Sequence, residues 1–205
     1  MNRFLGAAFA ALLSTTALAQ VNVVPSPGLA IENLRKQTYS AVAVGLATAA
    51  SATDVACISA SPSKEIHLKY IIISGTTGTN IVVPISILRR ATLDTGGTPA
   101  TGIALPVPAA NWPTNGPASA TLVSYTANPT ITDTSPGYFR TVGMAMTVTT
   151  AAGSSEQEFE FGTFVEGFAQ DLMLAKGSTQ QVCVNFGATT VTTPSINITF
   201  EWSEQ

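Results

Sequence analysis

The stretch "INITFEWSE", Ile196–Glu204, decides the fold class because its apolar and polar residues alternate without a break. Successive side chains of a β-strand point to opposite faces, so a period of two is typical of a strand with one buried face. We therefore expect Ile196, Ile198, Phe200 and Trp202 to face a core, and Asn197, Thr199, Glu201 and Ser203 to face water.

Two other stretches share this period. In "EFEF", Glu158–Phe161, each glutamate is followed by a phenylalanine, which predicts an acidic outer face and an aromatic inner one. In "IHLKYIIIS", the period predicts one face made of Ile66, Leu68, Tyr70 and Ile72 and an opposite face that carries His67 and Lys69.

Turn-rich clusters such as "SGTTGTN" and "LDTGGTPATG" separate the strand candidates, and no convincing long helix is present. This pattern predicts an all-β fold, an antiparallel β-sandwich of the jelly-roll type, in a single domain over residues 39–205. Pro84 indicates an edge strand or a bulge. The further strand candidates are Ala41–Leu46, Ile81–Arg90, Ala118–Thr126, Phe139–Thr149, Leu172–Ala175 and Gln181–Phe186.

The N-terminal residues have the features of an export leader. Arg3 precedes the apolar run Phe4–Leu13, and small residues lead to a cleavage position between Ala19 and Gln20. Residues 1–19 are therefore predicted to be a leader, and residues 20–38 an extended arm with several turn-forming residues. The alternative is an uncleaved apolar arm that docks on a partner. No apolar run reaches the roughly 18 residues of a transmembrane helix, so we expect no transmembrane segment.

Charge excludes one class of partner. Only 10% of the residues are charged, the net charge is −3, and Arg89-Arg90 is the one basic cluster. Nucleic-acid binding therefore has almost no support. A surface with so few charges favours burial against other subunits, so we expect a homo-oligomer.

The two cysteines, Cys57 and Cys183, both lie in strand-like runs. They can form a disulfide if their strands are neighbours, and such a bond would suit an oxidising compartment. The alternative is a pair of buried thiols that act as small apolar residues. With a single histidine, His67, the chain is not expected to hold zinc or any other metal or cofactor.

The sequence "LDTGGT" contains the Asp-Thr-Gly signature of aspartic proteases at Asp94, in which two such aspartates share one proton. There is one copy only, because Asp133 lies in "TDTSPG" without the glycine. A dyad would then need a homodimer, and we interpret Asp94 as part of a hairpin turn.

Two further groups of titratable residues are interpreted as outward strand faces rather than sites. His67 lacks a G-x-S-x-G nucleophile, which argues against a Ser-His-Asp triad. Paired carboxylates could bind Ca²⁺ or hydrolyse a glycoside, but alternation with phenylalanines favours solvent exposure. This acidic group comprises Glu156, Glu158, Glu160 and Glu166. No catalytic residue is expected, and the chain is predicted not to be an enzyme.

Several phrases together resemble small virion-associated β-proteins of tailed phages and prophages, of the head-decoration or fibre type. They are "KEIHLKYIIISG" (Lys64–Gly75), "ISILRRATLDTGGTPATGIALP" (Ile85–Pro106), "ASATLVSYTANPT" (Ala118–Thr130) and "ITFEWSEQ" (Ile198–Gln205).

The resemblance implies a structural protein of the virion without catalysis, packed against copies of itself and neighbouring capsid or tail subunits. The leader does not fit, because virion proteins normally assemble in the cytoplasm. One alternative is therefore an exported bacterial surface or filament subunit that assembles by exchange of its N-terminal arm. The other is a secreted carbohydrate-binding domain, for which Trp112 is the candidate stacking residue, although a loop anchor is the simpler role for it.

Overall fold

The computed structural model describes residues 37–47, 53–101, 103–105, 116–148, 154–162 and 172–205, and Lys36–Gln205 forms one compact unit. The secondary structure of these residues consists of β-strands without a helix. The described residues therefore contain no helix that could cross a membrane. Their strands are β1 (Gln37–Leu46), β2 (Asp54–Ser59), β3 (Ile66–Thr76), β4 (Ile81–Arg90), β5 (Thr98–Thr101), β6 (Ile103–Leu105), β7 (Thr121–Ser124), β8 (Gly137–Met146), β9 (Ser155–Glu160), β10 (Leu172–Leu174), β11 (Gln181–Asn185) and β12 (Ser195–Glu204).

The predicted boundaries are met to different degrees. Strand β4 has the expected bounds, whereas β1 begins at Gln37, inside the expected arm. Strand β5 lies in the predicted turn cluster "LDTGGTPATG", and β6 lies outside every predicted strand. The predicted leader, the Ala19–Gln20 position, Trp112 and Glu166 lie outside the described residues.

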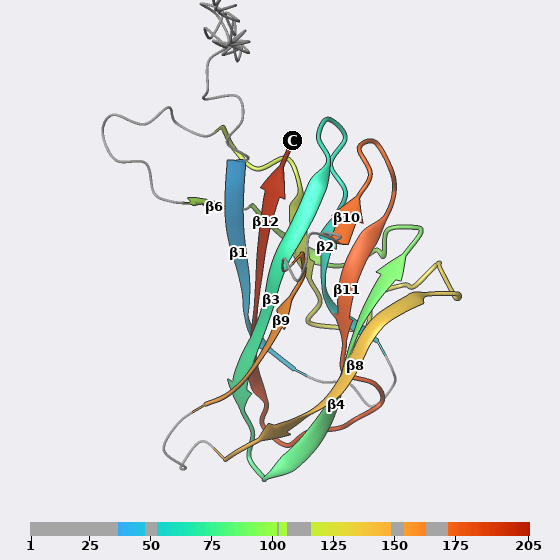
Figure 1. Cartoon of the computed structure of the whole chain (residues 1–205). Helices are drawn as coiled ribbons and strands as arrows, with labels where there is room; N and C mark the ends of the chain where they lie inside the picture. Colours follow the sequence, from blue (N-terminus) through green and yellow to red (C-terminus); the bar gives the residue numbers. More distant parts are fainter. Residues whose placement is uncertain (1–36, 48–52, 102, 106–115, 149–153, 163–171) are drawn as a thin grey trace, which may run out of the picture. The chain divides into compact units, whose positions relative to one another are not determined.

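The strands form two antiparallel sheets (Figure 1). The first sheet has the order β10-β3-β12-β1-β6, and β9 also pairs with β3. The second has the order β5-β7-β2-β11-β4-β8. The all-β antiparallel class predicted from the sequence is therefore confirmed.

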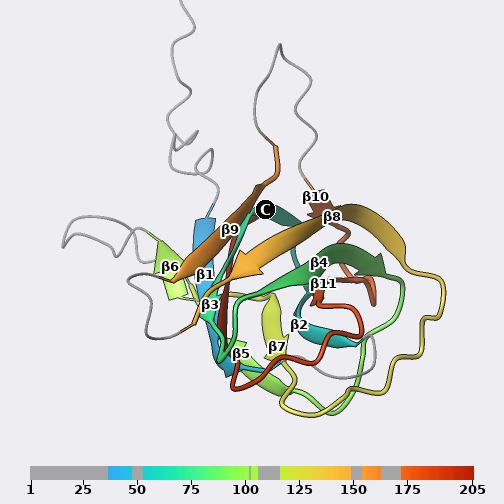
Figure 2. The same ribbon diagram turned by 90° about the horizontal axis from the view of Figure 1, so that it is seen from below.

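One apolar core draws side chains from both sheets, and Figure 2 shows strands of both sheets from below. Strand β12 lies between β3 and β1, and its alternating side chains Ile196, Ile198, Phe200 and Trp202 are fully buried, as predicted. The Trp202 ring stacks on Tyr39 with a centroid distance of 5.8 Å. Ser203 was expected to face water but is 1% exposed, so the alternation ends before the strand does.

A bulge changes the expected faces of β3. Opposite β12 the register steps from Glu201↔Tyr70 to Trp202↔Leu68 and thus skips Lys69. An extra residue reverses which side chains face the core beyond it. Ile71 and Ile73 are consequently buried, and the predicted inward positions of Tyr70 and Ile72 are wrong.

Strand β4 is an interior strand, so the edge position predicted from Pro84 is wrong for the strand as a whole. The reason that proline is tolerated is local. Strand β11 pairs with β4 from Ser86 to Arg90, and among the described strands the segment Ile81–Ile85 pairs with β8 alone. Proline lacks an N–H, and a segment with one neighbour has positions where none is needed.

Candidate functional site

The candidate site lies on the face of the second sheet that points away from the main core. Cys57 of β2 and Cys183 of β11 are directly opposite each other, and a disulfide joins them with a Cα–Cα distance of 4.1 Å. Both residues are at most 1% exposed and pack with Leu88 and Tyr125 in a second apolar cluster. The two strand runs were visible in the sequence, but their register, which brings the sulfur atoms together, was not.

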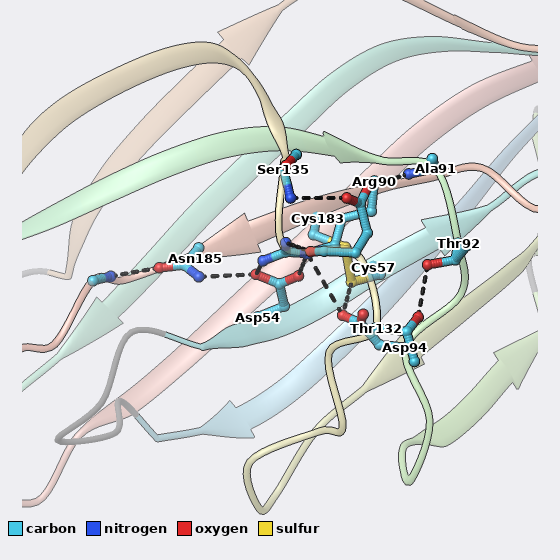
Figure 3. Close-up of polar contacts among 12 residues, drawn as sticks. Asp54, Cys57, Arg90, Ala91, Thr92, Asp94, Thr132, Ser135, Cys183 and Asn185 are labelled. Carbon is cyan, nitrogen blue, oxygen red and sulfur yellow. Dashed lines mark hydrogen bonds and ion pairs between the residues drawn. A yellow bond between two sulfur atoms is a disulfide. The ribbon is translucent and has the colours of Figure 1, made fainter.

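A buried ion pair lies beside the disulfide (Figure 3). Arg90, at the end of β4, binds both carboxylate oxygens of Asp54: Nε bonds to Oδ2, and Nη2 donates to Oδ1 at 3.0 Å. The Asn185 amide donates to Oδ1 of Asp54 at 2.8 Å, and Arg90 Nη1 donates to the Asp133 carbonyl at 2.6 Å. The side chains of Arg90 and Asp54 are 5% and 0% exposed. This bidentate geometry is the strong form of an ion pair.

The sequence pattern missed Asp54 for a physical reason. It lies three residues before Cys57, and strict alternation would put the two side chains on opposite faces of β2. Opposite β11, however, Val55 is skipped in the register between Ala56↔Val184 and Asp54↔Asn185. This bulge turns Asp54 to the face of Cys57.

Asp94 completes the cluster from the connection between β4 and β5. Its Oδ2 lies 4.0 Å from Arg90 Nε and 3.9 Å from the sulfur of Cys57. The hairpin interpretation of this segment is wrong, because β4 and β5 are not neighbours in the sheet. Asp94 is also only 8% exposed. Its buried carboxylate holds the β4–β5 connection against the cluster, whereas a hairpin turn would leave it exposed to solvent.

The partner carboxylate of Asp94 is Asp54 of the same chain, not a second Asp-Thr-Gly copy. Burial, and then the hydrogen bond and charge of Asp54, raise the pKa of Asp94 to about 7, while Arg90 acts in the opposite direction. Two adjacent carboxylates that share a proton resemble a protease dyad. Both are buried, however, and Asp54 is committed to Arg90, so a peptide could not reach them in this conformation.

Two polar atoms of the cluster lack a hydrogen-bond partner within the described part of the chain. These are Oδ1 of Asp94 and the hydroxyl of Tyr125, which is 4% exposed. Burial, with the charges of Asp94 and Asp54, raises the pKa of Tyr125. Buried polar atoms are rarely left unpaired, so this cluster has unused binding capacity.

Replacing Asp94 with asparagine should make the protein more stable at high pH. With a folded-state pKa near 7 against an ordinary 3.8, the folded protein keeps a proton that the unfolded chain loses. The parent protein therefore loses stability as pH rises from about 4 through about 7. We expect the gain of Asp94→Asn over the parent to grow by at most about 1.4 kcal/mol per pH unit in that range. Urea unfolding of both proteins from about pH 5 to pH 8 measures this difference.

Asp133→Asn is the matched control for this measurement. The Asp133 carboxylate accepts the N–H groups of Ala91 and Ser135 at 2.6 and 2.9 Å, and these bonds lower its pKa. Loss of this carboxylate cannot produce a gain that increases with pH. A pH-independent difference between Asp94→Asn and the parent would contradict a raised pKa at Asp94.

A second buried carboxylate, Glu204, was also missed, although the period of two that buries Trp202 puts it on the inward face of β12. Its oxygens accept Nε1–H of Trp202 at 3.0 Å, the N–H and hydroxyl of Ser119 at 2.8 and 2.7 Å, and the N–H of Ala120 at 3.0 Å. Lys64 Nζ lies 3.2 Å away. Burial alone would raise the pKa of Glu204, but these hydrogen bonds outweigh it and lower the pKa. Through these bonds, Glu204 holds Ser119 and Ala120, the residues just before β7, against the end of β12.

The remaining sequence candidates do not join the cluster. The side chain of His67 is 12% exposed, not solvated as expected, and its Nε2 lies 2.8 Å from Gln205 Nε2 and 3.9 Å from Glu65. Glu156 and Glu158 are exposed on β9 while Phe159 is buried, as the alternation predicted. Glu160 accepts the hydroxyl of Tyr70 at 3.1 Å.

Comparison with protein-family models, with characterised proteins and with solved structures finds no match to this chain.

Proposed function

We propose that the chain is a non-catalytic structural subunit of a phage-type virion, a capsid-decoration or fibre protein, whose two sheets form a jelly-roll sandwich. It acts by packing against copies of itself and neighbouring subunits. The observation that carries the proposal is the order in which the strands pair.

The pairing is nested. Strand β1 pairs with β12, β2 with β11, β3 with β9 and β10, and β4 with β8, all antiparallel. The early strands thus pair with the late strands in reverse order, as in a long hairpin rolled up into two sheets. Jelly rolls have this plan, and capsid proteins are a major class among them. Lectins and cupins share it, so the fold supports the proposal only together with the sequence resemblance.

Among the described residues, several apolar side chains are exposed and available for contact with other subunits, and two pairs of them each lie close together on one strand. On the outer face of the first sheet, Val42 and Val44 of β1 are 47% and 70% exposed. On β8, which ends the order of described strands in the second sheet, Tyr138 and Phe139 are 66% and 41% exposed. Few charges and apolar edge residues favour contact with other subunits.

We expect the protein to sediment as an oligomer at micromolar concentration and the Val44→Asp variant to dissociate at least about tenfold more readily. A buried interfacial carboxylate without a partner costs more than the roughly 1.4 kcal/mol that corresponds to this factor. Sedimentation velocity over a concentration series measures it. The matched control is Val82→Asp, since Val82 is a valine of β4 with 62% exposure. A monomer at every concentration would refute the assembly proposal.

The disulfide favours a second candidate, an exported bacterial surface or filament subunit, because such bonds persist mainly in oxidising compartments. Mass spectrometry of purified particles from the producing strain separates the two. Recovery in phage particles supports the virion subunit. Recovery only from the cell surface, with residues 1–19 removed, supports the exported subunit.

A further inference from the structure

Four potential metal-ligating atoms meet at the buried cluster. Asp54, Cys57, Asp94 and Cys183 each offer one carboxylate oxygen or sulfur, and these atoms all lie within 4.8 Å of one another. Four ligands at the usual zinc distances of about 2.0–2.3 Å are about 3.3–3.8 Å apart in a tetrahedron. Binding an ion would draw the more distant atoms slightly closer, and the two sulfur atoms, which are bonded to each other here, would have to move apart after reduction. All four residues are at most 8% exposed, so such an ion would be shielded from water.

The disulfide and a metal ion exclude each other, because a sulfur atom ligates a metal as a thiolate. Reduction of Cys57–Cys183 by a phosphine or a dithiol adds two electrons and two protons and gives two thiols. A divalent ion that then binds both sulfurs releases these two protons to solvent. The bonds formed are two metal–sulfur and two metal–oxygen bonds.

The surroundings of these four residues favour the binding of a cation. Oδ1 of Asp94 is buried without a hydrogen-bond partner in the described ranges, and its Oδ2 lies 3.9 Å from the Cys57 sulfur. The carboxylate is therefore held beside the sulfur atoms with one oxygen unused. A buried unpaired acceptor costs stability, which coordination to an ion would recover.

Charge and ligand type select the ion. Two thiolates and two carboxylates carry four negative charges, and a divalent ion with the Arg90 guanidinium, whose Nε bonds to Asp54, supplies three positive ones. Such a set is close to neutral, unlike the bare ligands. Mixed sulfur and oxygen ligands suit Zn²⁺, whereas Ca²⁺ and Mg²⁺ prefer oxygen alone.

We propose that the reduced protein binds one Zn²⁺ at Asp54, Cys57, Asp94 and Cys183, so that this position holds either a disulfide or a metal ion. The sequence pattern argued against zinc because it counted only cysteine and histidine. The two aspartates that complete the set come from a bulge and a loop. A chain that folds in a reducing compartment would have its two sheet segments joined there by the ion instead of by the covalent bond.

Cobalt(II) is the probe for this site, because thiolate coordination gives it strong sulfur-to-metal absorption in the near ultraviolet and tetrahedral bands in the visible. The full-length protein is reduced with a phosphine under anaerobic conditions, the two thiols are counted, and Co²⁺ is titrated. We expect one Co²⁺ per chain, displacement by Zn²⁺ with loss of colour, and no binding by the oxidised protein. Cys183→Ser, which leaves one thiolate, should weaken Co²⁺ binding and reduce the sulfur absorption, and Asp94→Asn should weaken binding at least tenfold. Asp133→Asn, outside the set, should bind as the parent does.

Reduction of the disulfide could unfold the chain, and an unfolded chain would not test the site. The second measurement is therefore the stability of the reduced protein with and without Zn²⁺. If zinc binds the folded reduced protein, the midpoint of urea unfolding under reducing conditions rises with Zn²⁺ concentration. Two free thiols without cobalt–sulfur absorption would overturn the proposal. So would a reduced chain whose unfolding is unaffected by Zn²⁺, or equal Co²⁺ binding by oxidised and reduced protein.

Discussion

Replacing Arg90 with methionine is expected to lower the free energy of unfolding by about 3–5 kcal/mol at neutral pH. Methionine fills a similar volume but leaves the Asp54 carboxylate, which is fully buried, without its guanidinium. Arg90 also donates to the backbone carbonyl of Asp133 at 2.6 Å, so the segment before β8 loses an anchor. Urea unfolding followed by circular dichroism measures the loss.

The chain offers a close control in Arg89. It precedes Arg90 on the same strand, is exposed, and pairs in register with Val182 and Gly137. Arg89→Met should change stability by less than about 0.5 kcal/mol. Adding Asp54→Asn to Arg90→Met should recover part of the loss, because the unpaired buried charge is then gone. A loss below about 1 kcal/mol for Arg90→Met would mean that the ion pair barely exceeds its own desolvation cost.

The Cys57→Ala/Cys183→Ala double variant should lose about 3–5 kcal/mol relative to the oxidised parent. The bond links residues 126 positions apart, and closing so long a loop removes much of the conformational freedom of the unfolded chain. Alanine is small and apolar, so the packing near Leu88 and Tyr125 changes little. Thermal and urea unfolding with and without a reductant measure the effect.

The same experiment contains its control. Without added metal, the reduced parent should approach the stability of the double variant, and reductant should leave the double variant unchanged. A double variant within about 1 kcal/mol of the oxidised parent would show that the unfolded chain is already restricted near these residues.

The sequence predicted the fold class because the burial pattern of β12 is regular. Ile196 to Trp202 alternate without interruption, and each inward side chain is fully buried. In β3 the same reasoning held only up to the bulge at Lys69, since an inserted residue has no signature in the apolar pattern. Strands β5 and β6 were missed because they are short and lie in Thr- and Gly-rich sequence that is typical of turns.

The candidate site was less accessible to sequence reasoning. Cys57 and Cys183 were recognised as strand residues, but only the β2–β11 register puts them opposite each other. Arg90 was noted only as half of a basic pair, and its partner Asp54 is 36 residues away along the chain. The available signal was a charged residue at the start of an apolar strand run, Asp54 before "VACIS". Such a residue indicates that the aspartate is buried in an ion pair, but it does not identify the basic partner.

The nested pairing has a consequence for how the protein is made. Strand β12 lies between β3 and β1, so during synthesis these two strands have no bridge until the last of the described strands has left the ribosome. Pairings this distant along the chain delay folding, because loop closure must precede any gain from contact. Until then, the apolar faces of newly made β1 to β4 are exposed to solvent. Only 10% of the residues are charged, so few charges oppose aggregation of these faces. The nascent chain should depend on chaperones that bind exposed β-strands, and its yield should fall steeply when synthesis outpaces them.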